Sequence, residues 1–253
     1  MNSEFEGRGV VVTGAGSGIG RAAALRFASL GAGVLIADIN PVGAAAVAKE
    51  IEASGGTART VVGDLSDQGT VDEVITTAVE SFGNLGVLVN NAGIMDSMTA
   101  TAQVSDAEWE RVIRINLTAP FLLTRAALPH LLARGNGAIV NTASEAALRG
   151  SAAGTAYTVS KHGIVGLTKS TAVMYRERGI RVNAVAPGGT QTHITDTVTF
   201  DGDGASIMGR YRENVGRLAA AEEVAAAIVF LASDAASNIS GAVLPVDNGW
   251  SAV

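Results

Sequence analysis

The sequence contains no cysteine and no long apolar run. Without thiols the chain can form neither disulfides nor thiolate metal sites, and no segment approaches the ~20 apolar residues of a membrane-spanning helix. The opening MNSEFEGRG is charged and lacks the apolar centre of a signal peptide. A net charge of −6 disfavours nucleic acid, because phosphate recognition needs a basic face. We therefore expect a soluble, cytoplasmic protein with no metal site and no nucleic-acid or membrane partner.

Aromatic residues make up only 4% of the chain, so the core must consist mainly of Val, Ile, Leu and Ala. Short β-branched runs have the composition of strands that are buried on both faces; they cover 10–13, 33–38, 58–64, 85–91, 137–144, 180–187 and 242–247. Helical patterns lie between them, at 18–30, 41–54, 67–82, 105–134, 155–178 and 221–234. This alternation predicts an α/β protein: a single-domain Rossmann fold over 1–253, with a doubly wound, seven-stranded parallel sheet and helices on both faces.

One segment, 192–217, breaks this alternation. It shows no firm periodicity and contains Gly202, Gly204 and Gly209. A loop of this length inside a compact domain is usually a lid or a disordered segment. We predict that 192–217 is a substrate lid.

Glycines cluster between the first strand and the first helix, in the order T-G-x-x-x-G-x-G that begins at Thr13. Glycine permits a tight turn and lets backbone N–H groups approach a pyrophosphate at a helix N-terminus. Such a turn can also be a simple tight connection. Asp38, which ends the second strand, strengthens the nucleotide interpretation because a carboxylate there can accept both ribose hydroxyls of an adenosine. Asp38 would repel a 2′-phosphate, so we predict NAD rather than NADP, with Arg21 the one nearby residue that could oppose this.

Lysine is scarce, yet Tyr157 and Lys161 lie four residues apart in AYTVSK. On a helix they share one face. A core tyrosine beside a surface lysine would give the same spacing. The chemical alternative is that the ammonium lowers the pKa of the phenol, which is about 10 in a free tyrosine.

These features together resemble the short-chain dehydrogenase/reductase family. The resemblance spans almost the whole chain and rests on T13-G-A-G-S-G-I-G20, Asp64, N90-N-A-G93, Asn116, Ser144, Y157-T-V-S-K161 and P187-G188. It implies a hydride transfer between NAD(H) and an alcohol or ketone. Tyr157 would be the general acid/base, Lys161 would lower its pKa and hold the nicotinamide ribose, Ser144 would bond the reacting oxygen, and Asn116 would complete a proton relay through water.

The resemblance also implies residues that contact the two ligands. Those expected at the cofactor are Gly14, Ser17, Gly18, Ile19, Gly20, Asp38, Ile39, Asp64, Leu65, Asn90, Ala92, Gly93, Tyr157, Lys161, Pro187, Gly188, Thr190 and Thr192. Those expected at the substrate are Met95, Ser144, Glu145, Ala146, Leu148, Tyr157, Met208 and Tyr211. Because this second set is mainly apolar, we predict a hydrophobic secondary alcohol or ketone. His193, at the start of the lid, is interpreted as solvated.

Several alternatives stay open at this level. The chain could be an NADP-dependent ketone or 3-oxoacyl reductase, or a nucleotide-binding protein without catalysis. A methyltransferase would also suit the glycine turn and Asp38, although it gives Tyr157 and Lys161 no role. Related enzymes pair helices like 105–134 and 155–178, which predicts a homotetramer.

Overall fold

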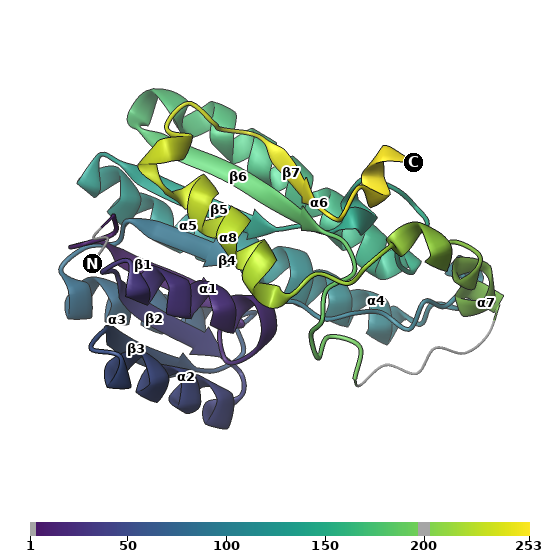
Figure 1. The fold of residues 1–253 in the computed structure, drawn as a ribbon, viewed down its shortest axis with the longest axis horizontal. Helices are drawn as coiled ribbons and strands as arrows, with labels where there is room; N and C mark the ends of the chain where they lie inside the picture. The colour runs from purple at the N-terminus through teal and green to yellow at the C-terminus, as the bar shows by residue number, and fades with distance from the viewer. Residues whose placement is uncertain (1–3, 197–202) are drawn as a thin grey trace.

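The computed structural model describes residues 4–196 and 203–253, which fold around one seven-stranded sheet (Figure 1). All neighbouring strands are parallel, in the order β3-β2-β1-β4-β5-β6-β7. The strands are β1 (Gly9–Thr13), β2 (Gly33–Asp38), β3 (Thr57–Val62), β4 (Val87–Asn90), β5 (Gly137–Thr142), β6 (Ile180–Pro187) and β7 (Val243–Val246). The predicted doubly wound parallel sheet is confirmed.

Helices cover both faces of this sheet. They are α1 (Gly18–Ser29), α2 (Pro41–Ala53), α3 (Gln68–Phe82), α4 (Asp106–Ile113), α5 (Ala119–Arg134), α6 (Thr155–Tyr175), α7 (Asp203–Gly209) and α8 (Ala221–Ala232). Side chains of β1 alternate between the faces: Val10 and Val12 pack in the cluster that contains residues of α1, α2 and α8, whereas Val11 packs with residues of α3 and α5. This two-sided burial explains why the strands read as continuous apolar runs.

The single helix expected over 105–134 is divided. A π-helical turn, Arg114–Thr118, separates α4 from α5. Pro120 has no N–H to donate to the carbonyl of Asn116, so the regular hydrogen-bond pattern cannot run through this point. Single π turns of this kind often occur at functional sites.

The segment 192–217 is only partly irregular. Its residues 197–202 lie outside the described part of the chain, but α7 and a 3₁₀ turn, Arg212–Val215, follow them. Gly204 in α7 packs so tightly on the loop after β4 that an added Cβ would lie 2.1 Å from the Met98 carbonyl oxygen. The expectation of a loop without regular structure was therefore wrong for 203–215.

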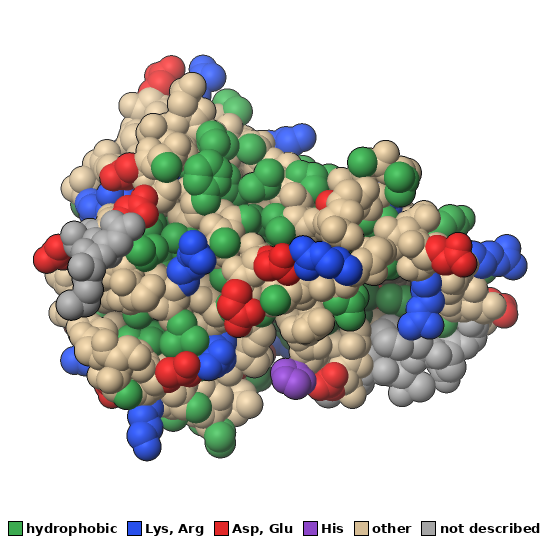
Figure 2. Space-filling model, in the orientation of Figure 1, with side chains coloured by type: hydrophobic (Ala, Val, Ile, Leu, Met, Phe, Trp, Pro, Cys, Tyr) green, Lys and Arg blue, Asp and Glu red, His purple; other side chains and the backbone are tan. Residues whose placement is uncertain are grey.

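Two further properties concern the surface. None of the helices in the described ranges is both long and apolar enough to cross a bilayer. On the face drawn in Figure 2, acidic and basic side chains are interspersed among apolar ones.

Candidate active site

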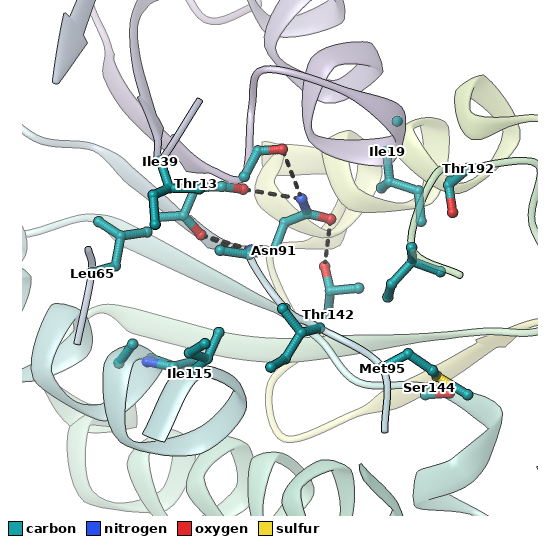
Figure 3. Close-up of a pocket in the computed structure, with 18 of the residues that line it drawn as sticks. Thr13, Ile19, Ile39, Leu65, Asn91, Met95, Ile115, Thr142, Ser144 and Thr192 are labelled. Atoms are coloured by element: carbon teal, nitrogen blue, oxygen red, sulfur yellow. Dashed lines mark hydrogen bonds between the residues drawn. The ribbon is translucent and has the colours of Figure 1, made fainter. Parts of the chain in front are cut away.

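A cavity of about 630 Å³ opens where the chain leaves the carboxyl ends of β1, β4, β5 and β6. β1 and β4 are neighbours in the sheet, with β2 and β3 on one side and β5, β6 and β7 on the other. The chain therefore reverses its direction across the sheet between β1 and β4, which is where parallel α/β sheets bind ligands. Figure 3 shows lining residues from these separate segments facing one space.

The glycine turn between β1 and α1 forms one wall of the cavity. Gly14 and Gly18 have positive φ values of 61° and 51°, a backbone conformation that strains other residues. A Cβ on Gly20 would lie 2.1 Å from the Gly14 carbonyl oxygen. The N-terminus of α1 begins here, with Ser17 as an N-cap whose side chain makes no capping bond. A glycine-rich turn at a helix N-terminus fits the pyrophosphate of a dinucleotide.

Asp38 lies at the cavity edge where β2 ends. Its Oδ2 accepts the N–H of Gly16 at 2.7 Å and its Oδ1 accepts the N–H of Asn40 at 2.8 Å. The carboxylate therefore joins the glycine turn to the loop after β2. Arg21 pairs with Glu50 at 2.6 Å outside the cavity lining, so it does not neutralise Asp38.

Asp64, which follows β3, also lines the cavity with Leu65. Hydrogen bonds from Ser66 and then the Arg114 guanidinium, 2.8 Å away, hold the pKa of Asp64 below its usual value against the effect of its burial. Arg114 begins the π turn, so this ion pair connects the segment after β3 to the junction between α4 and α5.

Asn90, predicted to touch the cofactor, does not line the cavity. Its side chain is buried and its Nδ2 donates to Asn141 Oδ1 at 2.9 Å. The adjacent Asn91 lines the cavity instead, and its Nδ2 donates to the Thr13 carbonyl at 3.0 Å (Figure 3). Successive side chains of a strand point to opposite faces, so Asn91 is the residue of this motif whose side chain faces the cavity.

Tyr157, Lys161 and Ser144 meet at the cavity, as the resemblance implies. Tyr157 and Lys161 lie one turn apart on α6 and are only 7% and 4% exposed. The Lys161 ammonium lies 5.5 Å from the centre of the Tyr157 ring and donates to the Thr142 carbonyl at 2.8 Å. Ser144 follows β5 and hydrogen-bonds with Tyr157. The alternative of a surface lysine is excluded by this burial.

Burial dominates the titration of both α6 residues. It raises the pKa of Tyr157 to about 12, with the Ser144 hydrogen bond acting in the opposite direction and the charge of Asp96 adding to the rise. It lowers the pKa of Lys161 to about 8. We expected Lys161 to lower the pKa of Tyr157, but in the chain alone its ammonium lies against the ring and bonds the Thr142 carbonyl, while desolvation prevails.

Asn116 occupies the π turn and is buried. Its Oδ1 accepts the N–H of Ile94 at 2.8 Å and its Nδ2 donates to the Ile94 carbonyl at 2.9 Å. A Cβ on Gly93 would lie 3.2 Å from Asn116 Oδ1 and 3.5 Å from Lys161 Nζ. Gly93 therefore allows the loop after β4 to approach both predicted catalytic side chains.

Most other predicted cofactor residues line the cavity. These are Gly14, Ser17, Gly18, Ile19, Asp38, Ile39, Asp64, Leu65, Ala92, Gly93, Pro187, Gly188, Thr190 and Thr192. Thr192 lies directly against the glycine turn, since a Cβ on Gly18 would lie 3.2 Å from its methyl group. Gly20 supports the turn from behind and is not part of the lining.

The predicted substrate residues divide into two groups. Met95, Ser144 and Tyr157 line the cavity, whereas Glu145, Ala146, Leu148, Met208 and Tyr211 do not. Glu145 is 1% exposed and forms an ion pair with Arg149, four residues later. It begins the 3₁₀ turn that follows Ser144. Burial raises the pKa of Glu145.

Residues that the sequence reasoning did not propose complete this end of the cavity. Ile94, Ser97 and Ile194 line it together with Met95. Each lies within two residues of a predicted site residue, namely Gly93, Met95 or Thr192, and this closeness in sequence was the available signal. His193 also borders the cavity, and its side chain is 79% exposed and bonded to Asp196, as expected for a solvated residue.

Comparisons with known proteins agree with this geometry. A model of the family described as "Enoyl-(Acyl carrier protein) reductase" matches residues 14–251. Cis-4-hydroxycyclohexanecarboxylate dehydrogenase of Sinomonas cyclohexanicum is 44% identical over 253 residues, which cover 100% of both chains. 3beta-hydroxysteroid dehydrogenase 2 of Eggerthella lenta is 40% identical over 257 residues, covering 99% of this chain and 97% of that one. The crystal structure of levodione reductase superposes with a TM-score of 0.88 at 36% identity, covering 98% of this chain and 99% of that one.

Proposed function

Because the chain belongs to the short-chain dehydrogenase/reductase family, we propose that it transfers a hydride between NAD(H) and a hydrophobic secondary alcohol or ketone. One observation carries this proposal. A buried phenol, a buried ammonium and a serine hydroxyl line the same cavity as a glycine turn that is hydrogen-bonded to an acidic side chain. A methyltransferase, or a protein that only binds a nucleotide, would not need the phenol, the ammonium and the hydroxyl.

The bound nicotinamide would accept the hydride from the carbinol carbon during oxidation and return it during reduction. Tyr157, as its phenolate, takes the hydroxyl proton of the alcohol, and as its phenol it gives that proton to the carbonyl oxygen in the reverse direction. Ser144 donates a hydrogen bond to the same oxygen, where negative charge develops. Lys161 keeps a positive charge beside the phenol and faces the cavity, where it can bond ribose hydroxyls.

The side chains at this end favour an alicyclic substrate. Ile94, Met95 and Ile194 give an apolar surface, and Met95 packs against the cluster that contains Tyr157. Two relatives carry names of enzymes that act on ring alcohols, a hydroxycyclohexanecarboxylate and a 3β-hydroxysteroid. We therefore propose a ring-bound secondary hydroxyl as the reacting group.

A substrate panel tests this function. Absorbance of NADH would be followed with cyclohexanol, cis-4-hydroxycyclohexanecarboxylate and a 3β-hydroxysteroid, and acetoacetyl-CoA would be supplied with NADH and NADPH. Turnover of a ring alcohol with NAD⁺ supports the proposal. Preferred reduction of acetoacetyl-CoA with NADPH would instead favour the acyl reductase that the name of the matching family model suggests.

Asp38 should determine cofactor choice. Its carboxylate can accept the adenosine ribose hydroxyls and would repel a 2′-phosphate. Charge-assisted hydrogen bonds contribute about 1.5–3 kcal/mol each, so Asp38→Ala should raise the KM for NAD⁺ roughly 10- to 100-fold and reduce the preference over NADP⁺. Asp38→Asn keeps an acceptor for Gly16 and separates loss of charge from loss of the turn. A parent enzyme that prefers NADP⁺ would refute this assignment.

We also propose that the chain forms a homotetramer through the helices of one sheet face. Apolar side chains on α6 remain exposed in the single chain, namely Val159, Val173 and Met174, and Phe121 is exposed on α5. Sedimentation velocity at micromolar concentration should give a species of four chains, and Met174→Glu should shift it toward smaller ones. A parent protein that sediments as a monomer would contradict the proposal.

A further inference from the structure

We propose that Asp96 is a positioning residue: its buried carboxylate fixes the first turn of α6, and with it Tyr157, to the loop that borders the substrate cavity. This inference rests on the proposed role of Tyr157. The predicted catalytic set does not include Asp96, and Asp96 is not itself among the residues that line the cavity.

Among the described residues, the carboxylate accepts hydrogen bonds from three backbone N–H groups. Asp96 is 3% exposed. Its Oδ2 accepts the N–H of Tyr157 at 2.9 Å, and its Oδ1 accepts those of Gly154 at 3.1 Å and Met98 at 3.2 Å. The ion pairs between described residues do not involve it. A buried carboxylate without a cation is stabilised here by peptide donors and by the positive end of the α6 dipole.

The α6 helix depends on this distant cap. Its own N-cap residue is Gly154, which has no side chain to bond the free N–H groups of the first turn. A Cβ on Gly154 would lie 2.5 Å from Asp96 Oδ2. The glycine therefore removes the local cap and at the same time makes room for the carboxylate that replaces it.

A second contact joins the same two segments. The hydroxyls of Thr101 and Thr155 are 2.7 Å apart, so the loop after β4 holds the start of α6 at two points. Met95, which lines the cavity, directly precedes Asp96 in this loop. Tyr157 is thus positioned by the segment that also contacts substrate, and α7 covers that segment through Gly204 (Figure 1).

The charge of Asp96 also changes the pKa of Tyr157. It raises the pKa of Tyr157, in the same sense as burial and opposite to the Ser144 hydrogen bond. Two other titratable groups lie near this turn: Lys161 on α6 and Glu108 on α4, whose Oε1 accepts the N–H of Ser97 at 2.7 Å. Removing the Asp96 charge while keeping its shape should therefore lower the pKa of Tyr157.

Asp96→Asn is the variant that does this. The chain has three tyrosines, so the phenolate absorbance of Tyr157 can be isolated by subtracting the Tyr157→Phe protein. At a fixed alkaline pH at which circular dichroism shows folded protein, Asp96→Asn should contain roughly three- to tenfold more Tyr157 phenolate than the parent. Glu108→Gln, a matched carboxylate on a neighbouring backbone N–H, should leave it unchanged.

Kinetics give the second readout. The rise of kcat/KM with pH for alcohol oxidation follows deprotonation of Tyr157 and should shift to lower pH in Asp96→Asn. Asp96→Ala should lower kcat more than it raises KM. If Asp96→Asn fails to fold, Gly154→Ala displaces the same carboxylate and should change the titration in the same direction. An unchanged Tyr157 titration in the folded variants would overturn the proposal. If the Tyr157 titration shifts but the pH profile of kcat/KM does not, the proposed role of Asp96 is supported. The same result would refute Tyr157 as the catalytic base.

Discussion

Replacement of Tyr157 by Phe should lower kcat for alcohol oxidation by about 10²–10⁴, the usual contribution of a positioned acid or base. The change removes a single oxygen from a side chain that is 7% exposed, so packing is preserved. Without that oxygen, the alcohol proton has no acceptor at the end of the cavity where Ser144 lies. Initial rates of NADH formation at saturating alcohol measure the effect.

The matched control is Tyr175→Phe. Tyr175 ends the same helix but packs in the core cluster between the sheet and α5, away from the cavity. Its loss of a hydroxyl should leave kcat within about twofold, as for a substitution outside the site. Equal losses in the two variants would show that the Tyr157 result reflects stability and not chemistry.

Replacement of Lys161 by Met should reduce kcat/KM by about 100-fold. At 5.5 Å from the ring centre and an effective dielectric constant of ~20, a unit charge supplies about 3 kcal/mol to a developing phenolate. Lys161→Arg should restore little activity, because the planar guanidinium does not fit the position of a compact ammonium that bonds the Thr142 carbonyl. Activity within threefold of the parent in Lys161→Met would contradict this role.

The same variant should gain stability at neutral pH. Burial lowers the pKa of Lys161 from 10.5 to about 8, so between these values the unfolded chain holds a proton that the folded chain has lost. The free energy of unfolding of the parent should therefore rise from about pH 8 to pH 10.5, and Lys161→Met should lack that rise. Thermal unfolding at pH 7 should show a higher midpoint for the Met variant, and a lower one would reverse the sign argued here.

The sheet could be predicted from the sequence because its five inner strands, β2, β1, β4, β5 and β6, are buried on both faces. Each reads as a short β-branched run, and the runs alternate with helical patterns. The glycine turn could also be predicted from the sequence, because Gly14 and Gly18 adopt positive φ and Gly20 has no room for a side chain. These are local requirements that the sequence records directly.

What escaped prediction depends on contacts between distant segments. The role of Asp96 requires knowing that the loop after β4 reaches the start of α6. Glu145 follows Ser144 directly, yet it turns away from the cavity toward Arg149. Pro120 explains the break at Arg114–Thr118 and could be seen in the sequence. A proline in the first turn of a helix is common, however, and does not by itself predict a π turn.

The central claim is that Tyr157 moves the proton while the nicotinamide moves the hydride. A single-turnover measurement tests it most directly: Tyr157→Phe is mixed with NADH, binding is confirmed by fluorescence, and a ring ketone is added in a stopped-flow instrument. The account predicts that NADH binds as tightly as it does to the parent and is then oxidised at least about 100-fold more slowly. Oxidation of the bound NADH at the parental rate would contradict it.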